Sequence, residues 1–300
     1  MRRASQVAAI GVALIVGLTG CGSNREKPAG LPMVVASTDV WGSVAQAVAG
    51  DDATVSSIVT NGSADPHSFE ASPSDAAAIA DASIVVYNGG GYDSWVDAVL
   101  ENHRNVPTVN AYSLLDAAAV GEPQPANEHI FYELNTAKAV ASRVAEKLAV
   151  DKPDKAAAFR SRAEEFGRKA DAILQREREI GTARPGAAVV ATEPVAHYLV
   201  RAAKVDDKTP EGFSNAIEQD TDPAPVDVAA MLDLITKREV SALLYNDQTS
   251  TEVTKKVRAA AESAGVPVVE VTETLPAGKD YLTWQSDTAE RLAAALGTNP

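Results

Sequence analysis

Four side chains of the types that bind metal ions stand in loop-forming stretches of this sequence. His67 lies in "NGSADPHSFEASPSD" and His129 lies in "ANEHIFYELNTAK". Glu193 directly follows the strand-like run "AAVVAT", and Glu273 ends the run "VPVVEVTE". Two neutral imidazoles and two carboxylates cancel the charge of a divalent cation and offer it both nitrogen and oxygen ligands. The pattern therefore indicates a site for a divalent transition metal.

The chain contains only four histidines, and the other two fit other roles. His197 is the rival for the place of Glu193, but it falls one helical turn beyond Pro194 and away from the end of the strand. There we expect a packed histidine or one that supports a ligand. His103 lies at a helix end, where its ring is favourable to the helix dipole. Taken singly, each of the four candidates also has a simpler interpretation as a loop, cap or turn residue.

Strand-like and helix-like segments alternate in both halves of the chain. The expected strands are Met33–Thr38, Thr54–Thr60 and Ser83–Gly91 in the first half, and Ala187–Thr192, Val240–Asn246 and Val266–Glu273 in the second. Such alternation is typical of a parallel sheet covered by helices on both faces. In open sheets of this kind, ligands bind outside the carboxyl ends of the strands. All four candidate ligands are therefore expected at such ends.

Between the two halves, apolar residues three and four positions apart predict one continuous helix from Pro153 to Ile180. At 1.5 Å per residue it would be about 42 Å long, enough to traverse a small domain. We therefore predict an α/β fold of two similar lobes, residues 32–150 and 183–300, joined by one long rigid helix at residues 151–182. The metal site is expected in the cleft between the lobes.

The beginning of the chain differs in character from the rest. Two arginines precede an apolar run from Val7 to Leu18, which is shorter than the roughly 20 residues of a membrane-spanning helix. Residues 1–20 are therefore predicted to be a signal peptide, with a short buried helix as the alternative. The following "LTGC" resembles the lipobox of bacterial lipoproteins and contains Cys21, the only cysteine. We expect a lipid anchor on Cys21 and a polar tether at residues 21–31.

Composition restricts the partners of the protein. The formal net charge is -14, and the sequence lacks the clustered Lys and Arg that bind phosphates, which excludes nucleic acid as the expected partner. The alternative function is a secreted zinc-dependent hydrolase, in which His67, His129 and one glutamate bind zinc and the other glutamate is a general base. The sequence has neither an HExxH pair nor a GxSxG turn, so we expect no enzyme.

The segments "DPHSFEASPSD", "EHIFYEL", "TEP" and "VTETLP" resemble the metal-binding solute-binding lipoproteins of bacterial zinc/manganese ABC uptake systems. The resemblance runs from the lipobox through nearly the whole chain. It implies that two lobes hold one metal ion with one ligand from each of four loops, here His67, His129, Glu193 and Glu273. It further implies a monomer, anchored through Cys21 at the extracytoplasmic face of the cell membrane, that delivers manganese or zinc to an ABC permease.

Two departures from the best-known zinc-binding members bear on the metal. No His-rich loop separates His67 from His129, and Glu193 stands where those members have a histidine. At nearly any site with nitrogen and oxygen ligands, zinc binds more tightly than manganese. Two carboxylates can nevertheless expand the coordination beyond the four ligands that suit zinc. The ligand set therefore favours manganese, with zinc left open.

Overall fold

The computed structural model describes residues 30–60, 62, 66–123 and 126–298. Residues 31–300 form one unit, and residues 1–30 form another. The predicted signal peptide, Cys21 and all but the end of the predicted tether lie outside the described residues. None of the helices within these ranges combines the length and the apolar character needed to cross a membrane.

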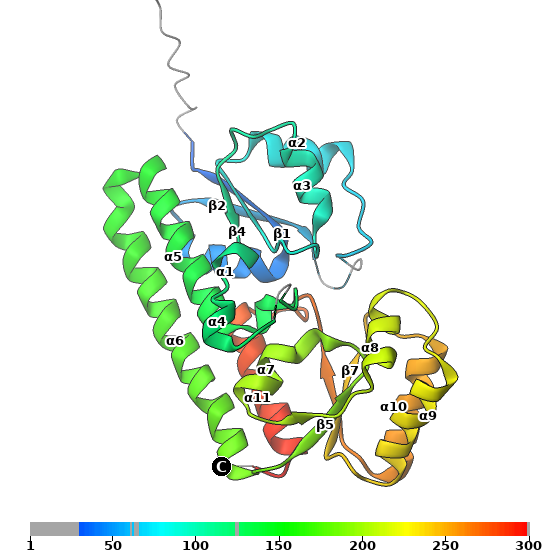
Figure 1. Cartoon of the computed structure of the whole chain (residues 1–300). Helices are drawn as coiled ribbons and strands as arrows, with labels where there is room; N and C mark the ends of the chain where they lie inside the picture. Colours follow the sequence, from blue (N-terminus) through cyan, green and yellow to red (C-terminus); the bar gives the residue numbers. More distant parts are fainter. Residues whose placement is uncertain (1–29, 61, 63–65, 124–125, 299–300) are drawn as a thin grey trace, which may run out of the picture. The chain divides into compact units, whose positions relative to one another are not determined.

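Two parallel four-stranded sheets form the framework (Figure 1). The first contains β1 (Met33–Thr38), β2 (Thr54–Val59), β3 (Ile84–Tyr87) and β4 (Thr108–Asn110); the second contains β5 (Ala188–Ala191), β6 (Asp206–Asp207), β7 (Ala242–Asn246) and β8 (Val268–Val271). Their orders are β2-β1-β3-β4 and β6-β5-β7-β8, so the two sheets have the same topology. Every residue of β3, β5 and β7 is buried, as expected for strands covered on both faces. The predicted α/β class is confirmed.

The helices connect and cover these strands. Before the linking helix come α1 (Asp39–Ala49), α2 (Pro73–Asp81), α3 (Ser94–Leu100), η1 (Tyr112–Leu114), α4 (Ala117–Val120), η2 (Ile130–Tyr132) and α5 (Leu134–Asp151). After it come η4 (Pro194–Ala196), α7 (His197–Ala202), α8 (Glu211–Glu218), α9 (Pro225–Thr236), α10 (Glu252–Ala264) and α11 (Tyr281–Ala295). We call the elements from β1 to α5 the first lobe and those from β5 to α11 the second lobe.

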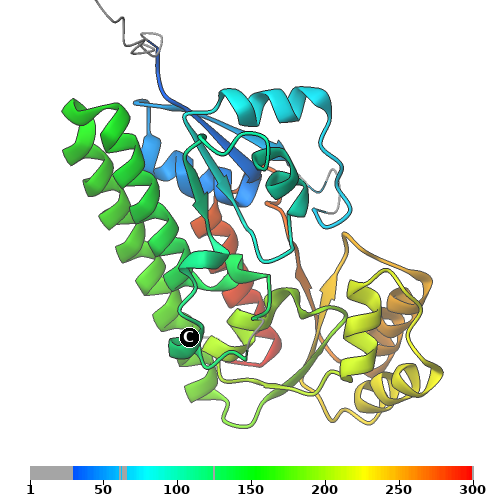
Figure 2. The same cartoon turned by 45° about the horizontal axis from the view of Figure 1, so that its top comes forward.

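The linking helix begins three residues later than the sequence pattern predicts. Residues Pro153–Lys155 form the short 3-10 turn η3, and α6 runs for 28 residues from Ala156 to Ala183. Proline has a fixed φ and no N–H group, so it is suited to an opening turn rather than to a helix interior. In both views α5 and α6 lie side by side (Figures 1 and 2), and Lys138 pairs with Asp171 across them.

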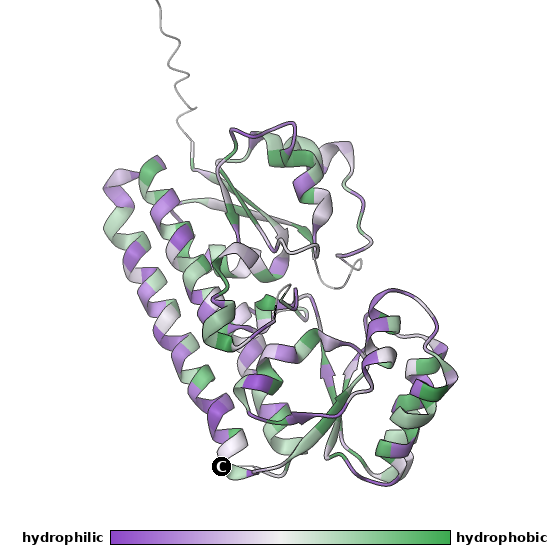
Figure 3. Ribbon diagram, viewed as in Figure 1, coloured by the Kyte–Doolittle hydropathy of each residue, from purple (hydrophilic) through white to green (hydrophobic). Residues whose placement is uncertain are grey.

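One hydrophobic core extends through both lobes. It includes Val34 and Val86 of the first sheet, Val189 and Leu244 of the second, and Phe166 of α6. Hydrophilic and hydrophobic residues alternate along α6, in keeping with one face on this core and one in water (Figure 3). Each sheet has a separate, smaller apolar cluster on its other face. Because the main core is shared, separating the lobes would expose apolar side chains to water, which opposes a wide opening.

Two glycines of α6 are expected to respond to alanine in opposite ways. At Gly181 a Cβ would lie 1.9 Å from the backbone oxygen of Ala203, whereas at Gly167 the nearest atom is 3.9 Å away on the flexible Lys138 side chain. Gly181→Ala should therefore lower the free energy of unfolding by about 1–3 kcal/mol. Gly167→Ala is the matched control and should raise it by about 0.5–1 kcal/mol, because glycine is unfavourable inside a helix.

Urea denaturation of the two variants measures these changes. Equal or greater stability of Gly181→Ala relative to the wild type would show that α6 and the end of α7 can separate at no cost, contrary to the close backbone contact seen here.

Candidate metal centre

Four chain segments from both lobes meet beyond the carboxyl ends of the strands. His67 lies between β2 and α2, and His129 follows β4 and directly precedes η2. Glu218 is the last residue of α8, which follows β6, and Glu273 lies just after β8. In the shared strand order, β2 corresponds to β6 and β4 corresponds to β8. The two lobes therefore contribute side chains from equivalent places, histidines from the first lobe and glutamates from the second.

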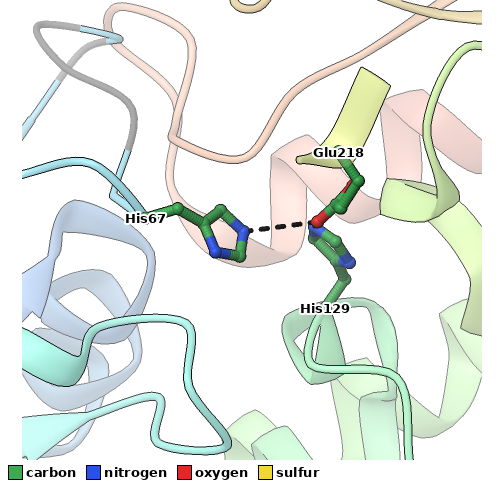
Figure 4. Close-up of side chains that lie close together, drawn as sticks. All are labelled: His67, His129 and Glu218. Atoms are coloured by element: carbon green, nitrogen blue, oxygen red, sulfur yellow. Dashed lines mark ion pairs between the residues drawn. The ribbon is translucent and has the colours of Figure 1, made fainter. Parts of the chain in front are cut away.

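The closest group consists of His67, His129 and Glu218, whose side chains point toward one another (Figure 4). Oε1 of Glu218 lies 3.4 Å from Nε2 of His67 and 3.4 Å from Nε2 of His129. Two metal–ligand bonds of about 2.1 Å that meet at a tetrahedral angle separate their ligand atoms by about 3.4 Å. The measured separations thus fit one metal ion held by both imidazoles and this carboxylate.

Glu273 brings a second carboxylate to the same place. Its Oε2 lies 4.0 Å from Nε2 of His67 and 3.9 Å from Nε2 of His129. The side chain is buried, and its Oε1 accepts a 2.8 Å hydrogen bond from Nδ2 of Asn246, the last residue of β7. This bond holds one oxygen and leaves the other directed at the histidines. A fixed carboxylate of this kind is typical of supported metal ligands.

The surroundings keep His129 neutral. Its side chain is buried, and this burial, with smaller contributions from His67 and His197, lowers the pKa of His129 well below its usual value. The rings of Tyr92 and Phe131 pack around it, with centroids 5.9 and 5.7 Å from that of the imidazole. A neutral imidazole retains the lone pair that a metal ion binds, so the ring is already in the binding form.

His67, His129 and Glu273 of the sequence-predicted site converge, because Oε2 of Glu273 lies 4.0 and 3.9 Å from Nε2 of the two histidines. The group of His67, His129 and Glu218 contains neither Glu273 nor Glu193. Glu193 is buried after β5, and its Oε2 accepts a hydrogen bond from the Thr249 hydroxyl. Its role as a ligand stays a prediction.

The remaining two histidines lie outside the group of His67, His129 and Glu218. Nε2 of His197 lies 2.7 Å from Oε1 of Glu122, which also pairs with Arg201. His197 thus lies against the ion pair of Glu122 and Arg201, as expected for a packed histidine. His103 is exposed on the first lobe.

Glu218 is not among the ligands predicted from the sequence, because its local sequence, "EGFSNAIEQD", has the appearance of an ordinary solvated helix end. Phe213 and Ile217 of the same helix are buried in the apolar cluster of the second lobe, and this packing directs the end of α8. The sequence signal that could have indicated Glu218 is the similar order of strands and helices in the two halves of the chain. His67 lies between the second and third strands of its half, and the equivalent connection of the other half contains Glu218.

The sequence is similar to those of known metal-binding proteins. A family model described as "ZnuA: Zinc-uptake complex component A periplasmic" matches residues 34–295. The manganese-binding lipoprotein MntA of Halalkalibacterium halodurans is 29% identical over 159 residues, 52% of either chain. The manganese ABC transporter substrate-binding lipoprotein PsaA of Streptococcus pneumoniae is 22% identical over 282 residues, 89% of this chain and 88% of the relative.

A solved structure has a similar fold over almost its whole length. The periplasmic zinc-binding protein TroA of Treponema pallidum superposes with a TM-score of 0.75 at 19% sequence identity, covering 89% of this chain and 99% of that chain. The fold likeness confirms the predicted two-lobed architecture, and the family match covers most of the sequence. The resemblance inferred from the sequence motifs is therefore confirmed, and the chain belongs to the ZnuA family of solute-binding components of metal-uptake complexes.

Proposed function

We propose that this protein captures one divalent transition metal ion, manganese or zinc, outside the cytoplasm and delivers it to an ABC permease. The proposed ligands are His67, His129, Glu218 and Glu273, with Glu193 as a neighbouring acid whose participation is to be tested. The observation that carries the proposal is the position of one Glu218 oxygen 3.4 Å from the Nε2 atoms of both histidines. Relatives described as substrate-binding lipoproteins of metal ABC transporters support it.

The hydrolase alternative is not supported. The family consists of solute-binding transport components rather than enzymes. The sequence also lacks the HExxH pair and the GxSxG turn of common hydrolases.

Manganese is the metal we propose under physiological conditions. The ligand set retains two imidazoles and two carboxylates when Glu218 is counted, and carboxylates that bind through both oxygens permit the higher coordination numbers that manganese accepts. Zinc should still bind tightly in vitro, because raw affinity at such sites favours zinc. The names of relatives include both metals.

Growth rescue tests the proposal. Cells that lack this protein should grow poorly in metal-depleted medium, and added manganese should restore growth better than added zinc. Metal analysis of the purified protein should find one bound ion per chain. A defect cured by zinc alone would overturn the manganese assignment, and a purified protein that binds neither metal would overturn the proposed function.

We also propose that the protein acts as a monomer anchored at the extracytoplasmic face of the membrane through a lipid on Cys21. The single cysteine in "LTGC" and the description of several relatives as lipoproteins support the anchor. The proposed ligands come from one chain, so no second copy is needed to complete the site. In the same rescue strain, Cys21→Ala should move the protein from the membrane fraction to the soluble fraction. Retention in the membrane would exclude this anchor, and sedimentation of the soluble form measures its oligomeric state.

A further inference from the structure

Asn127 makes two contacts with His129 through a single atom. Its Oδ1 lies 2.9 Å from the backbone N of His129 and 3.2 Å from the ring atom Nδ1. The backbone N–H can only donate a hydrogen bond, so the amide atom that faces it must be the oxygen and not the nitrogen. The orientation of the Asn127 amide is thereby fixed without reference to the imidazole.

This orientation determines which ring nitrogen carries the proton. An amide oxygen accepts hydrogen bonds and cannot donate one, so Nδ1 of His129 must be the protonated nitrogen. An imidazole that carries its single proton on Nδ1 has its lone pair on Nε2. That atom faces Glu218 Oε1 at 3.4 Å in the candidate site. The opposite tautomer would direct an N–H group at the place of the metal ion and prevent coordination.

The second lobe holds Asn127 in position. The Tyr198 hydroxyl of α7 donates a 2.7 Å hydrogen bond to the backbone oxygen of Asn127, and Nδ2 of Asn127 lies 3.5 Å from the backbone oxygen of Pro194. The helix α7 is itself bound to the first lobe, since Glu122 pairs with His197 and Arg201. Asn127 therefore contacts both the second lobe and the His129 ring of the candidate site.

We propose that Asn127 is a positioning residue that keeps His129 in the tautomer whose Nε2 can bind the metal, and that the second lobe holds Asn127 in place for this purpose. The inference rests on the proposed function, because it takes His129 to be a metal ligand. Outer partners that orient a metal-binding histidine and fix its tautomer commonly affect affinity by roughly 10–100-fold.

The test combines a spectroscopic and a binding measurement. Two-bond proton–nitrogen spectra of the ¹⁵N-labelled metal-free protein, assigned with a His129→Gln variant, should show the His129 proton on Nδ1. In Asn127→Ala the proton should shift toward Nε2, and the affinity for Zn²⁺ in calorimetric titrations should fall roughly 10–100-fold. Asn127→Asp retains an acceptor oxygen and should restore both the tautomer and most of the affinity. Asn102→Ala, at an exposed asparagine, is the matched control.

The outcomes separate this inference from the proposed function. A proton on Nε2 of His129 in the wild type, or an unchanged tautomer or Zn²⁺ affinity in Asn127→Ala, would overturn the role of Asn127 even in a protein that binds metal. If Asn127 supported only the fold, Asn127→Ala would leave the His129 tautomer unchanged, and Asn127→Asp would not restore the Zn²⁺ affinity. A wild type that binds neither Zn²⁺ nor Mn²⁺ would refute the proposed function and, with it, any part of Asn127 in metal binding.

Discussion

Replacing His129 with alanine should lower the affinity for Mn²⁺ and Zn²⁺ by more than about 100-fold, since loss of an outer partner alone commonly costs roughly 10–100-fold. His129 is buried, neutral and directed at Glu218, so its lone pair has no substitute in the variant. His67→Ala should have an effect in the same direction. The measurement is a competition titration against a metal-binding dye, with circular dichroism to establish that the metal-free variants are folded.

His103→Ala is the matched control, because His103 is exposed and lies outside the group of His67, His129 and Glu218. Its affinity should equal that of the wild type. His197→Ala tests the alternative ligand, and it should leave the affinity nearly unchanged because His197 pairs with Glu122. If the His129 variant bound metal as tightly as the His103 variant, the proposed centre would be wrong. The more exposed His67 keeps the test valid should removal of the buried ring disturb folding.

The second large effect is expected at Glu218. Glu218→Gln retains the shape of the side chain but removes its charge. It should weaken metal binding at least about tenfold, because the Glu218 carboxylate is the one that lies close to Nε2 of both histidines. Glu193→Gln should have a smaller effect, because Glu193 lies outside the group of His67, His129 and Glu218. The two variants therefore compare the ligand that the structure indicates with the one that the sequence resemblance implies.

Glu211→Gln, at the exposed opposite end of the same helix, controls for the loss of one negative charge from α8. It should leave the affinity within about twofold of the wild type, because a charge in solvent is screened by salt. A larger loss in Glu193→Gln than in Glu218→Gln would restore the ligand set read from the sequence and assign Glu218 a supporting role.

Much of the fold could be predicted because its signals are local. Apolar, β-branched runs mark strands buried on both faces, and apolar residues at helical spacing mark α6. The edge strands β4 and β6 were not predicted. They have three and two residues, too few for a recognisable pattern, and their pairing with β3 and β5 defines them.

The sequence alone determined the α/β class and the family. It also indicated His67 and His129 as candidate ligands, because both lie in loops with turn residues and family motifs. Only the tertiary structure added Glu218 to the candidate acids, and which acids bind the metal stays a prediction. Glu193 and Glu218 both follow strands of the second sheet, but packing directs one toward Thr249 and the other toward both imidazoles. Local propensity contains no information on such directions. The orientation of each side chain depends on how two parallel sheets of identical strand order pack on one shared core.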